Sequence, residues 1–578
     1  MAIDDETAAL IKKYAIKNAV DYGKAETGSV LGKIISLSIG IKVPELRKAV
    51  DEEVSRINRM DRQELEDEYK PFAAEFEQKA REKALEASKH SMVIEGALGG
   101  AVITRFPPEP GGYIHIGNAK QCILSNEIAT KYRGKIYLYF DDTNPEKCRQ
   151  EYVDGIKEDM EWLGIKFDKE YYASDNIEKV YQSAAKLIAS GNAYVCLCSA
   201  EEIKKKRHER VACAHAAQSP EQNASMFSEM LAHKYDEGEA VVRLKGEMAS
   251  DNATFRDPTL LRIKNTKHYR QGNKYIVWPT YHINTPVMDH LYGITDVIRG
   301  KEYEIWDEVN KRMLNLLGIT PPRFHYEARL SIIGNTTAKR VIRKLISEGL
   351  ISGWDDPRLL TIIALRRRGI QPEAIKEFVM RFGMSRTDSS VPMDMLLAEN
   401  KKIIDKFSKH LYFVDNPVEM IIKDLGIDRA ILPLHPQKEL GVREYSIGDS
   451  LFISGADAAS LKEGEMVRLK GLADIKITKT GSGISAEKAV ISARAADGQH
   501  YKIIQWVSAA ARVECSVEMP MRMLDDLGNF NHKSLVTISG YAEGYADRLE
   551  HGEIVQFERF GYCILDNNTE KKFIFISK

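Results

Sequence analysis

A strand–loop–helix–strand pattern near residue 100 constrains the fold of this chain more than any other feature. Residues 101–106 form an apolar run typical of a buried strand, and a loop rich in proline and glycine leads from it into a helix. A second apolar run covers residues 135–140. Two strands joined by a helix predict a parallel sheet with a right-handed crossover, in which ligands bind at the carboxyl ends of the strands. Arg105 and Asp141 lie at two such ends.

Changes of pattern along the 578 residues predict a multidomain α/β protein. We expect an N-terminal helical extension over 1–92, a Rossmann-like catalytic domain in two halves over 93–175 and 276–345, an inserted domain over 176–275, a helical region over 346–425 and a β-barrel region over 426–578. The apolar residues at helical spacing in the first part include Leu46, Val50, Val54 and Ile57. Those that alternate at period two in the last part include Val467, Leu469, Ile475 and Ile477. Pro71 is expected to kink or restart the helix that contains it.

Composition and charge exclude several classes of protein. The chain carries 83 basic and 84 acidic residues, which excludes a globally basic nucleic-acid coat but leaves a local basic groove open. No run of ~18 apolar residues occurs, so we expect no membrane span. The acidic N-terminus lacks the apolar segment of a secretory signal, and the seven cysteines are sparse and irregularly spaced. A reduced protein of the cytoplasm is therefore expected.

The loop after the first strand has the chemistry of a phosphate site. It runs from Pro107 to Asn118 and brings His115, Gly117 and Asn118 to the start of a helix, where unpaired N–H groups and the helix dipole favour a phosphate. Gly117 lets a nucleotide approach the backbone, and the other two side chains can donate hydrogen bonds to a phosphoryl group. The tetrapeptide alone is more typical of an ordinary helix start, but its strand–loop–helix context favours the phosphate interpretation.

Two pairs of residues in the inserted domain have the spacing of metal ligands. Cys196-Leu-Cys198 is followed by Cys213-Ala-His215, and three thiolates with one imidazole suit tetrahedral zinc. The alternative is a set of reduced, buried cysteines without metal. Inert cysteines are expected at the remaining positions, which are Cys122, Cys148, Cys515 and Cys563.

Two short basic runs, residues 204–207 and 366–368, are candidates to follow the phosphates of a nucleic acid. The first lies beside the cysteine pairs. Runs of this length are commonly solvated helix faces, and both interpretations stay open.

The segment from Arg105 to Lys120 closely resembles the HIGH signature of the class I glutamyl- and glutaminyl-tRNA synthetases. Further segments match in the family's order, at residues 139–146, 256–258, 262–264, 278–281, 289–301, 353–358, 365–369 and 505–508. The long helical extension, with a C-terminal half like that of glutaminyl enzymes, resembles the archaeal-type glutamyl-tRNA synthetases.

The second signature of this family, KMSKS, aligns with residues 336–340 and departs from the pattern. Lys339 matches the family's more important lysine, but Ala338 replaces the serine and Thr336 the first lysine. Asn118 also stands for the second histidine of HIGH, which keeps a hydrogen-bond donor but cannot become cationic. We expect these departures to affect the rate of the ATP-dependent step and not the kind of reaction.

The resemblance implies activation of L-glutamate by ATP with Mg²⁺ and transfer to the 3′ end of tRNA(Glu), with tRNA(Gln) left open as a second acceptor. The implied catalytic residues are His115, Asn118 and Lys339. The implied ATP-binding residues add Pro108, Gly117 and Arg340. The implied substrate-binding residues are Arg105 and Arg299 for a carboxylate, Asp141 for the amino group and Tyr281 as a wall.

The same resemblance implies how the domains divide the work. The insertion would bind the tRNA acceptor end, with structural Zn²⁺ on Cys196, Cys198, Cys213 and His215 as in some glutamyl enzymes. The helical region would contact the tRNA stem and the β-region the anticodon. We expect a monomer. Two alternatives remain: a glutaminyl-tRNA synthetase, which would need no zinc, and an inactive paralogue that binds tRNA.

Overall fold

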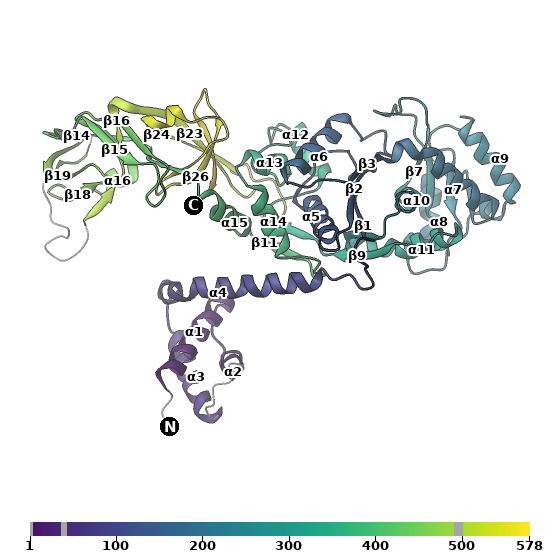
Figure 1. Ribbon diagram of the computed structural model, residues 1–578, viewed down its shortest axis with the longest axis horizontal. Helices are drawn as coiled ribbons and strands as arrows, with labels where there is room; N and C mark the ends of the chain where they lie inside the picture. Colours follow the sequence, from purple (N-terminus) through teal and green to yellow (C-terminus); the bar gives the residue numbers. More distant parts are fainter. Residues whose placement is uncertain (1–3, 36–42, 482, 490–500) are drawn as a thin grey trace. The chain divides into compact units, whose positions relative to one another are not determined.

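The computed structural model describes residues 4–35, 43–481, 483–489 and 501–578, and the chain forms two units, Met1–His90 and Ser91–Lys578. The described helices of the first unit are α1 (Asp5–Tyr22), α2 (Thr27–Ile35), α3 (Val43–Ile57) and α4 (Arg62–Ser91) (Figure 1). The side chains predicted at helical spacing, from Leu46 to Ile57, are buried between α1, α2 and α3. The expected restart at Pro71 is wrong: α4 continues through it. Pro71 is exposed there, so water can bond the carbonyl that proline leaves unpaired one turn earlier.

A parallel sheet forms the centre of the second unit. Strands β1 (Ile103–Phe106), β2 (Lys135–Phe140) and β3 (Lys169–Tyr172) pair in parallel, joined by α5 (Ile116–Lys131) and α6 (Gln150–Trp162). The predicted strand–helix–strand unit and its parallel pairing are therefore confirmed. Apolar side chains of α5 pack on this sheet in the same core as Phe106 of β1 and Ile136, Leu138 and Phe140 of β2, because the buried apolar strand β2 must be covered by helices.

The order in which the chain adds strands to the sheet reverses at β1. Strand β8 (Asp296–Gly300) pairs in parallel with β9 (Arg323–Glu327), and the N–H of Thr295, just before β8, donates to the carbonyl of Ile103 at 3.0 Å. The chain therefore runs from β1 to β2 on one side and returns as β8 on the other. This is a topological switch point, and ligands bind at the carboxyl ends of the strands that flank one.

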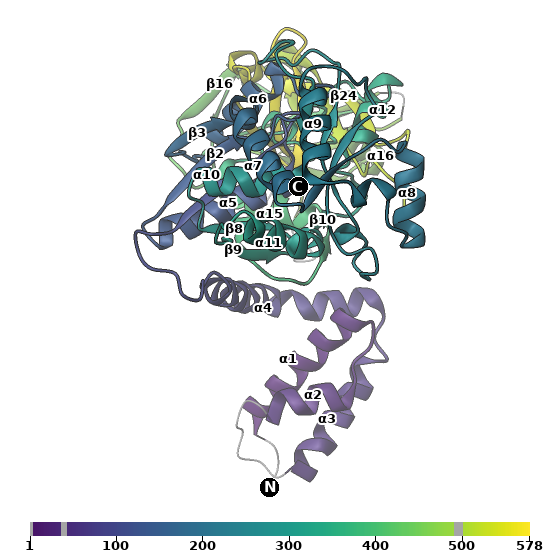
Figure 2. The same cartoon turned by 90° about the vertical axis from the view of Figure 1, so that its right-hand side faces the viewer.

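The segment between β3 and β8 contains a four-stranded antiparallel sheet in the order β4-β5-β6-β7. Its strands are β4 (Ala193–Cys196), β5 (Val241–Leu244), β6 (Thr259–Ile263) and β7 (Val277–Pro279). The helices around it are α7 (Ile177–Ala189), α8 (Ala200–Glu209), α9 (Pro220–Leu231) and α10 (Tyr281–Leu291). Figure 2 views the unit from the side of these helices. β7 leads directly into α10, which is followed in the chain by β8 (Asp296–Gly300).

A helical region connects the catalytic sheet to the C-terminal strands (Figure 1). Its helices are α12 (Lys339–Ser347), α13 (Ile362–Arg367), α14 (Pro372–Met380) and α15 (Asp394–Ile404). Helix α11 (Asp307–Leu316) comes earlier, between β8 and β9, and packs against α10. The short strands β10 (Leu330–Ile332) and β11 (Ser389–Val391) pair in parallel among them. Apolar residues of α14 and α15 belong to the same core as those of β1 and β2, so this region packs as part of the catalytic domain.

The C-terminal region is sheet-rich, as its period-two pattern predicts. One seven-stranded sheet contains β12 (Lys409–Leu411), β25 (Ile554–Phe557), β26 (Gly561–Asn567), β27 (Lys572–Ser577), β23 (Arg512–Pro520), β24 (Leu535–Glu543) and β13 (Phe413–Asp415). A second contains β21 (Lys502–Ile504), β18 (Met466–Leu469), β19 (Ala473–Lys479), β20 (Ile484–Ala489), β14 (Val418–Lys423), β17 (Ser450–Ile453) and β22 (Val507–Ser508). The remaining elements are the hairpin of β15 (Arg429–Pro433) with β16 (Val442–Ser446) and the helix α16 (Gly455–Ser460). The predicted inward residues Val467, Leu469, Ile475 and Ile477 are fully buried.

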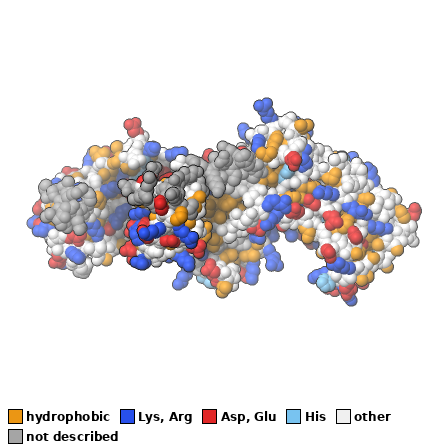
Figure 3. Space-filling view, turned by 90° about the horizontal axis from the view of Figure 1, so that it is seen from below, with side chains coloured by type: hydrophobic (Ala, Val, Ile, Leu, Met, Phe, Trp, Pro, Cys, Tyr) orange, Lys and Arg blue, Asp and Glu red, His pale blue; other side chains and the backbone are white. Residues whose placement is uncertain are grey.

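Basic and acidic side chains both occur across the face of the molecule in Figure 3. Within the described ranges, no helix is both long enough and apolar enough to cross a membrane.

Candidate active site

A cavity of about 410 Å³ opens at the carboxyl ends of the catalytic strands. The predicted site residues that line it are Arg105, Pro108, Asn118, Asp141, Tyr281, Arg299 and Lys339. Residues from both halves of the catalytic domain therefore meet in one site. Asp141 also donates its backbone N–H to the carbonyl of Pro108 at 3.0 Å, which fixes the loop after β2 against the loop after β1.

His115 and Asn118 cap helix α5 reciprocally. Nδ1 of His115 accepts the backbone N–H groups of Gly117 and Asn118, at 3.1 and 3.4 Å, and Oδ1 of Asn118 accepts the N–H of His115 at 3.2 Å. These bonds assign the imidazole proton to Nε2 and leave the Asn118 Nδ2 as a donor. Burial, with the charges of Lys339 and Arg329, lowers the pKa of His115 to about 3. Both side chains are therefore neutral hydrogen-bond donors at physiological pH.

Gly117 leaves room for this cap. A Cβ at position 117 would lie 3.0 Å from Cε1 and 3.1 Å from Nδ1 of His115. A side chain there would require the imidazole to shift by a few tenths of an ångström. The glycine thus serves the geometry of His115 as well as the approach of a ligand.

The segment aligned with the second signature contributes Lys339, the first residue of α12. Its Nζ donates to the carbonyl of Gly112 at 2.8 Å, and burial lowers the pKa of this ammonium group to about 8. Ala338 occupies the N-cap position and provides no side-chain cap, but the Thr336 hydroxyl accepts the Ala338 N–H at 3.1 Å. Arg340 is exposed and does not line the cavity. His115 and Gly117 are not among the lining residues either, and they contact the lining residue Asn118 through the helix cap.

Arg105 and Arg299, at the ends of β1 and β8, are almost fully buried, and each forms an ion pair. Asp289 accepts from Nε and Nη2 of Arg105, at 3.0 and 3.3 Å. Asp307 accepts from Nη2 of Arg299, whose Nη1 donates to the hydroxyl of Tyr281 at 3.2 Å. Buried guanidinium groups need such partners, which also orient them toward the cavity.

Asp141 is a carboxyl group with a perturbed titration. Burial raises its pKa to about 7, although the Thr143 hydroxyl, which donates to Oδ1 at 2.8 Å, acts to lower it. The amide of Asn284 donates to the same oxygen at 2.8 Å. A cation placed beside Asp141 would stabilise its ionised form.

Several residues of the site were not predicted to have a role. Asp289 and Thr143 lie inside segments that match the family, so their acidic and hydroxyl side chains could have been predicted as site residues. Asn284 and Asp307 carried none, because only the fold brings them to the site. Arg343, one turn after Lys339, donates to the Gly111 carbonyl and is a second cation beside the glycine loop.

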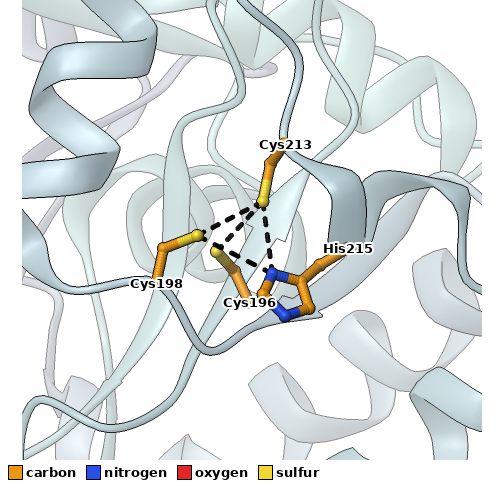
Figure 4. Close-up of side chains that lie close together, drawn as sticks. All are labelled: Cys196, Cys198, Cys213 and His215. Atoms are coloured by element: carbon orange, nitrogen blue, oxygen red, sulfur yellow. Dashed lines mark hydrogen bonds between the residues drawn. The ribbon is translucent and has the colours of Figure 1, made fainter.

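The predicted metal ligands come together in the insertion. Figure 4 shows the sulfur atoms of Cys196, Cys198 and Cys213 converging with Nδ1 of His215. The Cys213 sulfur lies 3.6 Å from each of the other two sulfurs and 3.3 Å from Nδ1, and Cys198 lies 3.8 Å from Nδ1. All three cysteines are buried, and their sulfur atoms and the His215 ligand nitrogen lie within 4.8 Å of one another. This is a compact soft donor set that could hold one metal ion.

The sheet and its switch point place Asn118 and Lys339, one from each aligned signature, beside one cavity. Residues 101–406 match the catalytic domain of the class I tRNA synthetases (E and Q), and residues 409–494 and 503–566 match two anticodon-binding domains of that class. The chain belongs to this family.

Within the family, the chain is similar to archaeal glutamate–tRNA ligases over nearly its whole length. It is 38% identical to the one from Nitrosopumilus maritimus, over 99% of this chain and 100% of the relative, and 37% identical to the one from Pyrococcus furiosus, over 99% of each. A crystal structure of the glutamate–tRNA synthetase from Elizabethkingia anophelis covers 53% of this chain and 71% of its own, with 18% identity and a TM-score of 0.41.

The His115 cap predicts an imidazole that does not titrate near neutrality. In ¹⁵N spectra of histidine-labelled protein, its resonances should remain those of the neutral tautomer protonated at Nε2 from pH 8 down to pH 5. A His115→Gln variant would assign the signal. Titration of this signal with a midpoint near the ordinary ~6.5 would contradict the assigned cap.

Proposed function

We propose that this chain is a glutamate–tRNA ligase, which activates L-glutamate with ATP and Mg²⁺ and transfers it to the 3′ end of tRNA(Glu). The observation that carries the proposal is a single cavity lined by two kinds of residue. Asn118 and Lys339 can donate hydrogen bonds to the phosphates of a nucleotide. The two buried arginines, Arg105 and Arg299, with Asp141, suit an acidic amino acid. The names of the archaeal relatives support the same activity.

In the first step, a carboxylate oxygen of glutamate attacks the α-phosphorus of ATP, and pyrophosphate leaves with the bridging oxygen. Nε2–H of His115 and Nδ2–H of Asn118 would donate to the α-phosphate as negative charge grows on it. The Lys339 ammonium group would neutralise the leaving phosphates. Bound Mg²⁺ would supply further positive charge at the same phosphates. Positioning and charge provide most of the acceleration, because no covalent enzyme intermediate is needed.

The amino acid would be held by its charged groups. Asp289 engages Nε and Nη2 of Arg105, so Nη1 is the nitrogen through which Arg105 would meet the side-chain carboxylate. Arg299 and the Tyr281 hydroxyl would complete that wall. Asp141 would accept the α-ammonium group. A positively charged wall favours glutamate over the uncharged glutamine.

In the second step, the 2′-hydroxyl of the terminal ribose of tRNA attacks the carbonyl carbon of the mixed anhydride, and AMP leaves. The inserted domain lies between the two halves of the catalytic domain, where it could guide the acceptor end into the cavity. The matched anticodon-binding domains would hold the other end of the tRNA. We further propose that the enzyme acts as a monomer in the cytoplasm.

Zinc is proposed as a structural ion on Cys196, Cys198, Cys213 and His215. Tetrahedral bonds of about 2.3 Å to sulfur and about 2.0 Å to nitrogen imply edges of about 3.8 Å between sulfurs and about 3.5 Å between sulfur and nitrogen. The four contacts described above, at 3.3–3.8 Å, lie near these edges, and all four atoms lie within 4.8 Å of one another. A bound ion would join the end of β4 to the loop before α9.

Aminoacylation of total archaeal tRNA with labelled glutamate or glutamine tests the function. We expect glutamate incorporation that depends on ATP and Mg²⁺, and probing the charged tRNAs would show whether tRNA(Gln) is also an acceptor. Lys339→Ala should lower kcat by about 10²–10³-fold with tRNA binding kept, because it removes a transition-state cation. Lys344→Ala, on the exposed side of the same helix, is the control and should change little. Glutamine incorporation would indicate the sister enzyme, and tRNA binding without charging an inactive paralogue.

The pKa of Asp141 predicts a pH-dependent affinity for glutamate. Only the ionised carboxylate can receive the α-ammonium group, so the KM for glutamate should rise roughly tenfold between pH 8 and pH 6. Asp141→Asn should raise the KM and flatten this profile. Asp159, another buried carboxyl whose pKa is raised to about 7 but which does not line the cavity, provides the control. If Asp159→Asn, and not Asp141→Asn, flattened the profile, the role of Asp141 would be wrong.

The metal proposal predicts one zinc ion per chain by elemental analysis of the purified protein. Cys213→Ser should remove it, because Cys213 lies beside all three other ligands. Cys515→Ser, a buried cysteine of β23, should retain the metal. Wild-type protein purified without chelators and free of zinc would contradict the proposal.

A further inference from the structure

A second cavity, of about 270 Å³, lies at the junction between the catalytic domain and the C-terminal sheets. Its wall includes Ile332 at the end of β10, Asp394 at the start of α15, Pro520 at the end of β23 and Phe575 of β27. It shares no lining residue with the active-site cavity, and the proposed chemistry makes no use of it.

Arg368, which lines this cavity, is a buried cation with little compensation. Its side chain is 7% exposed, its Nη2 donates to the carbonyl of Ile576 at 3.2 Å, and its Nε has no hydrogen-bond partner in the described part of the chain. No carboxylate of the described residues forms an ion pair with it. Burial lowers its pKa to about 10, opposed by the charge of Asp394. Burial of a guanidinium group without a counterion costs desolvation free energy, which a bound anion would offset.

The other charged side chains that line the cavity are either ion-paired or exposed to solvent. Arg358 donates to both carboxylate oxygens of Asp356, at 2.8 Å each, and is thereby neutralised. Arg522 is exposed and lies 3.5 Å from a carboxylate oxygen of Asp526. Asp394 is exposed and is the acidic residue of the lining. Arg368 is therefore the buried charge that lacks a counterion.

Helix α15 adds a second attraction for an anion. Its first residue, Asp394, and its N-cap residue, Met393, both line the cavity, and the N-cap makes no side-chain capping bond. The N–H groups at a helix N-terminus and the helix dipole favour negative charge. This helix end and the uncompensated arginine come from separate segments and converge on the same space.

We propose that this cavity is a binding site for a phosphate group, held by Arg368 with the N-terminus of α15 and closed by Arg522. The planar donor fork of arginine matches phosphate oxygens. The volume lies near the lower end of the ~300–1,000 Å³ of sites for drug-sized ligands, which favours a small anion such as free phosphate, or one phosphate of an RNA backbone.

The site is placed to affect the loop that carries Lys339. Gly334 and Asn335 line the cavity, and the loop begins directly after them. The Gly334 carbonyl accepts the N–H of Leu524, and Asn335 Nδ2 donates to the carbonyl of Arg358, at 2.9 and 2.7 Å. A bound phosphate would join these segments to α15. This phosphate site is independent of the proposed aminoacylation activity.

Calorimetric titration of inorganic phosphate into the full chain tests the proposal. The protein would carry Lys339→Ala, which removes the principal phosphate ligand of the active-site cavity. We expect saturable binding that weakens at least tenfold on Arg368→Met. The melting temperature of phosphate-free Arg368→Met should not fall, since the change removes an uncompensated buried charge, whereas a merely structural arginine would lower it.

Two further variants keep the test decisive if Arg368→Met folds poorly. Arg522→Gln alters an exposed residue and should also weaken phosphate binding, whereas Arg429→Gln, on the exposed face of β15, should not. Repeating the titration with tRNA separates the two sources: competition assigns the site to a backbone phosphate, and undiminished binding assigns it to the free ion. Absence of phosphate binding, together with unchanged tRNA affinity in both variants, would overturn the proposal.

Discussion

The rest of the site depends on the buried ion pair between Arg105 and Asp289. Arg105 ends the central strand β1 at the switch point, where a cation is useful to a ligand but is removed from water. Asp289 makes that burial tolerable, and it does so from α10, the helix that follows the last strand of the insertion. The same bond that keeps the guanidinium charged therefore also fixes the insertion to the catalytic sheet. Arg299 and Asp307 repeat this arrangement at the end of β8.

The local elements around the site could be predicted because their causes are local. An apolar run between turn signals predicts β2 at its observed bounds, and the spacing within each pair of metal ligands is a property of a few residues. The partners that complete the site could not be predicted in this way. Asn284 is 143 residues from Asp141, and Asp289 is 184 residues from Arg105, so only the closed fold brings them together. The approach of the two metal-binding pairs likewise depends on how β4 meets the following loop.

The basic run at 366–368 illustrates a limit of interpreting sequence by composition. A run of three arginines predicts either a phosphate track or a solvated face, but the three side chains have three different environments. Arg366 pairs with Glu158, Arg367 pairs with Asp566 and Asp355, and Arg368 is buried beside a cavity. Consecutive positions at the end of a short helix point in different directions, so the run is not one functional unit.

The hydrogen bond from Lys339 to the Gly112 carbonyl has a consequence for the order of events. The ammonium group has an acceptor within the protein, and that acceptor belongs to the loop that leads into His115. In the proposed activation step, Lys339 would exchange this neutral carbonyl for an anionic phosphate oxygen. Binding of the triphosphate would then release the Gly112 carbonyl from the lysine, so that the glycine loop and α12 would change partners together.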